Sequence, residues 1–125
     1  MKVRCFRIFN AKGCQIEQSS WLTIGNIYRV LEIYVVRDAR VKFRVVSDDN
    51  ATPAYFLWSE FEIVTQSIPS CWVVRFQASS HMILGPSEWM APDFWEHYFD
   101  PDKHGHAEAR KTFEDIYHAM IAEEP

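Results

Sequence analysis

The spacing of apolar residues changes at Gly85-Pro86, and this change constrains the fold more than any other feature of the chain. Before it, apolar and polar residues alternate in short runs, as they do from Val41 to Val46. A period of two is typical of half-buried β-strands. After it, apolar residues recur at the three- and four-residue spacing of one helical face, from Ala109 to Ile121. The sequence therefore predicts a β region over residues 1–85 and a helical region over residues 86–125.

The predicted β region consists of short apolar runs separated by turn-forming residues. Extended segments are predicted over residues 3–8, 27–36, 41–46, 54–58, 61–64, 71–76 and 81–84. Turns are predicted at residues 25–26, 37–40, 47–50 and at Ser79-Ser80, where Gly, Asn, Asp and Ser favour reversal of the chain. Short strands with regularly spaced turns are typical of a small antiparallel β barrel or sandwich.

In the region after Gly85, helix starts are predicted at residues 87–89 and 92–96, and Pro92 suits the first turn of a short helix. Asp100-Pro101-Asp102 interrupts the pattern, and a longer helix is predicted over residues 106–122. A chain of 125 residues has the length of one typical domain. We therefore expect a single α+β domain over residues 1–125, mainly β, in which a small antiparallel barrel or sandwich precedes C-terminal helices.

Charge is divided along the chain at the same boundary. Residues 1–85 carry a net charge of +3, whereas residues 86–125 carry three Lys or Arg against ten Asp or Glu, a net charge of −7. The acidic region is also rich in large aromatic side chains. A surface that combines acidic and aromatic groups suits a basic protein partner, whereas it would repel the phosphates of nucleic acid. We expect a small binding domain that takes a basic protein and no nucleic acid.

The sequence also predicts where the protein works. Cys5, Cys14 and Cys71 are odd in number and form no C-x-x-C pair, which favours a reducing compartment over a disulfide framework. Charged residues interrupt the first apolar positions, unlike a signal peptide, and no apolar run approaches the length of a membrane-spanning helix. We expect a cytoplasmic protein that does not enter a membrane.

No set of residues indicates catalysis or a bound metal. His97, His104, His106 and His118 are close in sequence, but no Cys or acidic residue stands at a zinc-like spacing from the His104-Gly105-His106 turn. Nucleophile elbows and glycine-rich phosphate loops are missing from the sequence, and nothing marks Cys14 as an activated nucleophile. We expect no enzymatic activity, no metal and no cofactor.

The basic residues of the β region leave one alternative open. Lys42 and Arg44 alternate with apolar residues along one predicted strand, and Arg75 lies on another. The simplest interpretation is the solvated face of a sheet. The alternative function is a small β-barrel nucleic-acid-binding protein that uses these three side chains.

The expected binding surface combines acidic residues with aromatic anchors. Acids steer association and a buried aromatic side chain slows dissociation. Trp89, Phe94 and Trp95 could instead pack a short helix against the β region, and the sequence leaves both options open. The candidate partner-binding residues are Asp48, Asp49, Glu88, Trp89, Asp93, Trp95, Glu96, Tyr98, Asp100 and Asp102.

Four segments, taken in order, resemble a known class of proteins. They are WLTIGNIYRVL (residues 21–31), FRVVSDD (43–49), IPSCWVV (68–74), and the acidic aromatic stretch from GPSEW through DFWE to FD (85–100). The chain resembles the small bacterial immunity proteins that are encoded beside toxins of contact-dependent growth inhibition and related polymorphic toxin systems. This resemblance spans roughly residues 20–120.

The resemblance implies a function that agrees with the charge distribution. Immunity proteins commonly neutralise a basic nuclease toxin by covering its active site with acidic side chains, and they have no catalytic residues of their own. The expected partner is thus a cognate toxin domain. An adaptor that binds another bacterial protein would use a similar surface and remains a third option.

Overall fold

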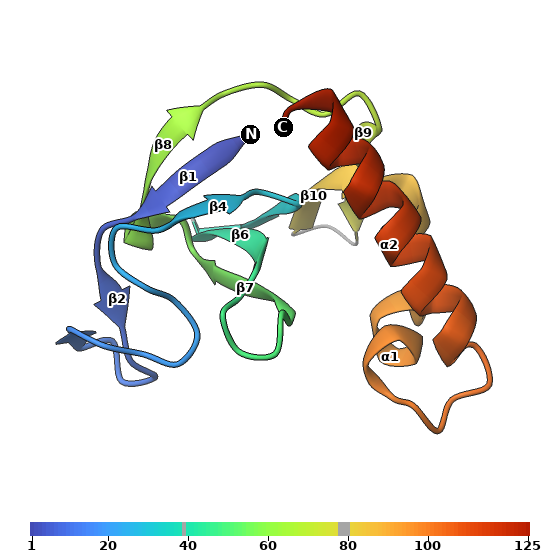
Figure 1. The fold of residues 1–125 in the computed structure, drawn as a ribbon, viewed down its shortest axis with the longest axis horizontal. Coiled ribbons are helices and arrows are strands. Elements are labelled where there is room, and N and C mark those ends of the chain that lie inside the picture. Colours follow the sequence, from blue (N-terminus) through green and yellow to red (C-terminus); the bar gives the residue numbers. More distant parts are fainter. Residues whose placement is uncertain (39, 78–80) are drawn as a thin grey trace.

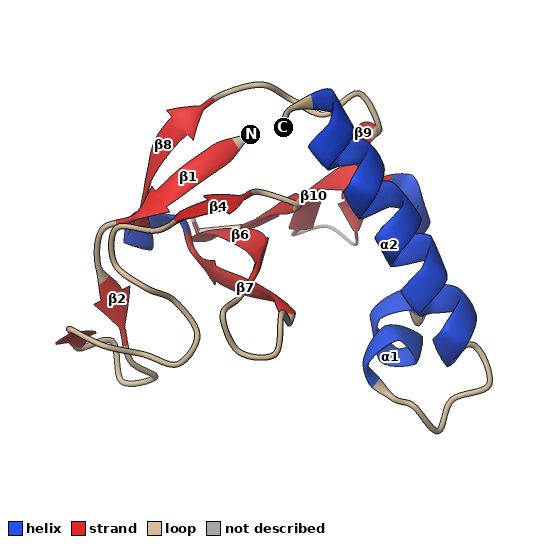
Figure 2. Ribbon diagram, in the orientation of Figure 1, coloured by secondary structure: helices blue, strands red, loops and turns tan. Residues whose placement is uncertain are grey.

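The computed structural model describes residues 1–38, 40–77 and 81–125. Ala39, within the predicted turn at residues 37–40, and the predicted turn at Ser79-Ser80 lie outside the described residues. The first part of the chain forms strands and the last part forms helices, as Figures 1 and 2 show. The prediction of an α+β fold that is mainly β, with C-terminal helices, is confirmed.

The strands form antiparallel sheets. A three-stranded sheet has the order β4-β1-β8, a five-stranded sheet has the order β7-β6-β5-β10-β9, and β2 and β3 form a small hairpin. These described strands do not close into a barrel. A short 3-10 helix, η1 (Trp58–Glu60), joins β7 of the five-stranded sheet to β8 of the three-stranded sheet. The strands are β1 (Lys2–Cys5), β2 (Ile8–Phe9), β3 (Gln15–Ile16), β4 (Ile27–Arg29), β5 (Glu32–Val36), β6 (Arg40–Val46), β7 (Pro53–Leu57), β8 (Phe61–Thr65), β9 (Trp72–Gln77) and β10 (His81–Pro86).

The two main sheets are linked by a bend in the segment that was predicted as one strand over residues 27–36. Val30 donates its backbone N–H to the carbonyl oxygen of Met1 at 2.9 Å, and Leu31 donates to that of Arg44 at 2.8 Å. The chain therefore passes from pairing with β1 to pairing with β6 between these two residues. Because successive side chains point to opposite sides of an extended chain, Val30 and Leu31 enter different hydrophobic cores.

After β10 the chain forms the helical lobe, defined as residues 87–125. It contains the 3-10 helix η2 (Ser87–Met90), α1 (Phe94–Phe99) and α2 (His106–Glu123). The predicted helix over residues 106–122 corresponds to α2. The predicted start at residues 92–96 is displaced to Phe94, because Asp93 has left-handed backbone angles (φ 61°) that a helix does not continue. Helices long and apolar enough to cross a membrane do not occur in the described ranges.

The apolar interior is divided between the sheets and the lobe. The sheet core lies between the two sheets and includes Val3, Cys5, Leu22, Tyr28, Val30, Phe43, Val45 and Phe61. The lobe core lies beneath the helices and consists of Leu31, Trp89, Phe94, Tyr98, Ala109, Phe113 and Met120. The half-buried Trp72 packs against both cores. Helix α2 runs back from α1 toward β1, so that the two ends of the chain lie side by side (Figure 1).

Candidate functional site

Two of the candidate partner-binding residues, Asp48 and Asp49, belong to the turn between β6 and β7. The carboxylate of Asp48 accepts hydrogen bonds from the hydroxyls of Thr23 at 2.7 Å and Tyr28 at 3.0 Å. The backbone carbonyl of Asp49 accepts a bond from the N–H of Thr52 at 3.1 Å, which closes the turn. These contacts hold the turn in place, and neither aspartate borders the pockets that the lobe residues line.

Two of the three candidate aromatic anchors lie in the lobe core. Trp89 is 1% exposed and stacks on Phe113 with ring centroids 5.0 Å apart, while Tyr98 is 2% exposed and contacts the same ring edge-on. Both side chains therefore hold the lobe together and are not available as surface anchors. Of the residues for which the sequence left a packing role open, Trp89 and Phe94 lie in this core, which also contains Leu31 from the β region. Trp95 is half-buried and borders a pocket.

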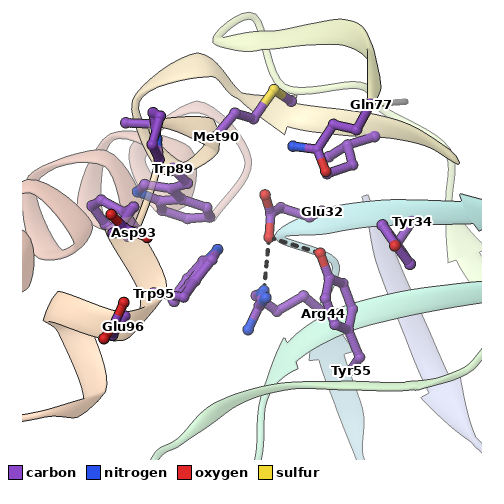
Figure 3. A pocket seen from close by; sticks show the side chains of 14 residues that line it. Glu32, Tyr34, Arg44, Tyr55, Gln77, Trp89, Met90, Asp93, Trp95 and Glu96 are labelled. Atoms are coloured by element: carbon purple, nitrogen blue, oxygen red, sulfur yellow. Dashed lines mark hydrogen bonds and ion pairs between the residues drawn. The ribbon is translucent and has the colours of Figure 1, made fainter. Parts of the chain in front are cut away.

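This pocket has a volume of about 440 Å³ and lies where the five-stranded sheet meets the helical lobe (Figure 3). Strands β5, β6 and β7 supply its polar floor, Glu32, Arg44 and Tyr55. The other side is formed by η2, by the segment that follows it and by α1, and includes Trp89, Asp93, Trp95 and Glu96. The structure thus brings four of the candidate residues together around one hollow.

A buried ion pair forms the floor of the pocket. Glu32 and Arg44 are opposite residues on β5 and β6, and Arg44 Nε donates to Glu32 Oε1 at 2.7 Å. Arg44 Nη1 also donates to the carbonyl oxygen of Pro53 at 3.0 Å, and the hydroxyl of Tyr55 donates to Glu32 Oε1 at 3.3 Å. Removing one partner of such a pair leaves an uncompensated buried charge and costs about 3–5 kcal/mol.

Arg44 also connects the sheet to the lobe. Its guanidinium lies over the ring of Tyr55, 4.0 Å from the centroid, and over the ring of Trp95, 3.7 Å from the centroid. One aromatic residue comes from the sheet and the other from α1, so the cation is enclosed between them. Cation–π contacts of this kind contribute about 0.5–2 kcal/mol each, with the larger values where the cation is desolvated.

Burial also changes the acid–base properties of the floor. Desolvation raises the pKa of Glu32 above its ordinary value, although the charge of Arg44 opposes this effect. Desolvation and the neighbouring Glu32 likewise raise the pKa of Tyr55, so its hydroxyl remains protonated and donates. The floor therefore offers a carboxylate whose first oxygen is engaged by two donors. This arrangement is suited to binding a further donor.

The sequence did not predict Glu32, Tyr55 or Gly85 as site residues. Gly85 lies on β10 next to Glu32, and a Cβ at this position would stand 2.7 Å from the Cγ of Glu32, closer than atoms normally approach. The available signal was a pair of opposite charges, Glu32 and Arg44, inside neighbouring alternating strands. Their alternation with apolar residues is equally typical of a solvated sheet face.

The acids at the rim of the pocket differ in their partners. Glu96 pairs with Lys103 at 2.9 Å on the exposed surface of α1. Asp93 is exposed and forms no ion pair with any residue in the described ranges. It thus leaves a negative charge at the entrance of the pocket.

The remaining acids of the lobe lie elsewhere on its surface. Glu88 and Glu108 are exposed and line a second hollow of about 520 Å³ between η2, α1 and α2, together with His97 and His104. Asp100 and Asp102 lie in the loop between α1 and α2, where Asp100 accepts the backbone N–H of Asp102 at 2.9 Å. In the part of the chain that the structure describes, no three His, Cys, Asp or Glu residues could share a metal ion.

One of the three residues of the alternative nucleic-acid surface is buried. Arg44 is 6% exposed and is enclosed by Glu32, Tyr55 and Trp95, so it cannot contact a phosphate. The interpretation of Arg44 as part of a solvated sheet face is wrong for the same reason, because the helical lobe covers this end of the sheet.

Comparisons of the chain with protein-family models, curated proteins and solved structures found no match, so geometry and charge carry the functional proposal.

Proposed function

We propose that this chain is an immunity protein that acts in the cytoplasm, where it binds a cognate toxin domain and neutralises it by covering its active site. The toxin is a basic protein, and a nuclease is the activity that this mode of inhibition fits best. The helical lobe forms most of the contact surface. The protein itself carries out no catalysis.

The observation that carries the proposal is the excess of unpaired acid on the helical lobe. Its two lysines, Lys103 and Lys111, are each paired with an acid of the lobe, and Arg110 lies over the ring of Tyr98. Within residues 87–125, all of which the structure describes, six side-chain carboxylates form no ion pair. They are Glu88, Asp93, Asp100, Asp102, Glu108 and Glu123, of which Glu123 accepts hydrogen bonds from Ser70.

The packing of the lobe favours this use of its surface. Its large aromatics are mostly held in the lobe core, which fixes the backbone on which the acids are carried. A rigid array of like charges raises the association rate with an oppositely charged partner by about 10–10³-fold at low salt. A basic active site that normally receives phosphates would be attracted in this way.

The proposal is tested by reversing acidic charges on two different surfaces of the protein, in separate variants. Glu88→Lys with Glu108→Lys reverses two exposed acids that share one hollow of the lobe. The control, Glu17→Lys with Glu62→Lys, makes the same change of net charge at exposed positions of the β region. With the cognate toxin domain, the lobe variant should associate about threefold to tenfold more slowly at low salt.

The control variant should associate at nearly the rate of the unchanged protein, and high salt should reduce the difference between the two variants. Equal slowing by both variants would mean that net charge alone matters, and no slowing by either would remove the lobe from the interface. Production of the protein should also protect cells that make the toxin domain. Binding to a non-toxic bacterial protein without protection would replace this proposal with the adaptor function.

A further inference from the structure

We propose that the pocket between the five-stranded sheet and the helical lobe receives a lysine or arginine side chain, whose N–H groups donate to the second oxygen of Glu32. This inference rests on the proposed function for the source of the side chain, which is the basic partner. The chemistry of the ligand, a cationic group on an apolar stem, follows from the pocket itself.

The floor supplies the acceptor. Glu32 is 1% exposed, and its Oε1 receives both of the hydrogen bonds that Arg44 and Tyr55 provide. Its Oε2 receives none from the residues that the structure describes, and Figure 3 shows it directed away from Arg44, into the pocket. A carboxylate at such depth is stabilised strongly by a further charged donor, because the surroundings screen the interaction weakly.

The walls match the stem of a long basic side chain. Tyr34, Ile83, Met90 and Phe94 line the pocket and present aromatic and aliphatic surface. Lysine and arginine bury their methylene groups along such surfaces while their charged ends reach a polar group. A volume of about 440 Å³ accommodates one side chain of this kind.

The balance of charge selects a cation over an anion. The charge of Arg44 is compensated by Glu32, and the charge of Glu96 by Lys103. Asp93 at the rim is the charge that remains, so the pocket is negative at its entrance. A phosphate or carboxylate would meet Asp93 first and then the oxygen of Glu32, and both would repel it.

The test uses small probes and requires no toxin. The probes are the Nα-acetyl amides of arginine and lysine, with the corresponding citrulline amide as the neutral isostere of arginine. Binding to the full chain is followed by the NMR signals of the Trp95 indole and of the Tyr34 and Glu32 backbone. We expect dissociation constants of about 1 mM for at least one cationic probe and binding at least about tenfold weaker for citrulline.

Two variants and one control locate the site. Glu32→Gln should abolish the preference for the cationic probe. Asp93→Asn, which keeps a residue suited to the left-handed backbone at φ 61°, should weaken binding by about threefold through loss of the rim charge. Asp102→Asn makes the same change at an exposed position outside the pocket and should leave the affinity unchanged.

Equal binding of arginine and citrulline amides would overturn the inference, as would wild-type affinity in a folded Glu32→Gln protein. If Glu32→Gln fails to fold, equal affinities of Asp93→Asn and Asp102→Asn would overturn it instead. Absence of probe binding in a protein that still neutralises its toxin would refute the pocket and leave the proposed function intact. Binding of the cationic probe by a protein that forms no complex with the toxin would support the pocket and refute the proposed function.

Discussion

Gly85 is the residue that allows a carboxylate to lie beneath the helical lobe. A methyl group at this position would stand 2.7 Å from the Cγ and 3.3 Å from the Oε2 of Glu32. Because Glu32 is fixed by Arg44, it cannot move aside without weakening the ion pair. We expect Gly85→Ala to lower the free energy of unfolding by about 1–3 kcal/mol in urea denaturation, as overpacking does, and to shift the NMR signal of the Trp95 indole. A change below about 0.5 kcal/mol, the scatter of ordinary surface substitutions, would show that the site relaxes freely.

The same residues explain what the sequence could and could not predict about the site. Asp93, Trp95 and Glu96 were found because acid and aromatic residues alternate along one segment. Glu32 was missed, and Arg44 was predicted at a solvated face, because a charged residue in an alternating strand is normally solvated. Their burial depends on which element covers the strand, and that is a property of the tertiary structure that no local pattern records.

The C-terminal end of α2 is connected to the sheets by hydrogen bonds from Arg29 to the carbonyl oxygens of Met120 and Glu124, and by the carboxylate of Glu124. Glu124 accepts hydrogen bonds from the amino group of Met1 at 2.9 Å and from the hydroxyl of Thr65 at 3.1 Å, and it lies 3.8 Å from Arg29. Burial opposes ionisation of Glu124, but these donors and the charge of the amino group outweigh it and lower its pKa from 4.5 to about 2. The carboxylate therefore stabilises the fold above pH 4.5, and this contribution is lost as the pH falls toward 2.

Glu124→Gln should thus lower the free energy of unfolding by about 1–3 kcal/mol at pH 7. The difference from the unchanged protein should shrink between pH 4.5 and about pH 2, as measured by urea denaturation at several pH values. Glu108→Gln is the matched control, since Glu108 is exposed. A difference in unfolding free energy that stays constant over this pH range would indicate that packing, and not the charge of Glu124, holds the end of α2.

At the scale of elements, the periodicity of apolar residues predicted the features that depend on local spacing, which are the strands and the long helix. The stripe from Ala109 to Ile121 predicted α2 almost to its ends, and the turn residues separated most of the strands. The start of α1 was displaced because Asp93 adopts left-handed angles, which composition does not reveal. The strands do not close into a barrel, and this could not be predicted because the pattern of a strand does not record which other strand it pairs with.

The whole molecule contains two hydrophobic cores, and their connection determines whether it unfolds as one unit. Val30 and Leu31 are adjacent, are both 0% exposed and belong to different cores, while Trp72 packs against both. A change in one core is therefore transmitted to the other through shared backbone and a shared side chain. We expect the described lobe and sheets to unfold in a single cooperative transition.

Leu31→Ala tests this connection because Leu31 is a lobe-core residue carried by the bend between β4 and β5. The variant should lose about 2–5 kcal/mol of unfolding free energy, and the loss should be the same whether unfolding is followed at the Trp89 indole in the lobe or at the Val45 methyl groups in the sheet core. Ile63→Ala, at a 47% exposed position of β8, should shift both transitions only slightly. If Leu31→Ala moved the Trp89 transition alone, the helical lobe would be a separate folding unit, and the pocket at its junction with the sheet would open before the sheets unfold.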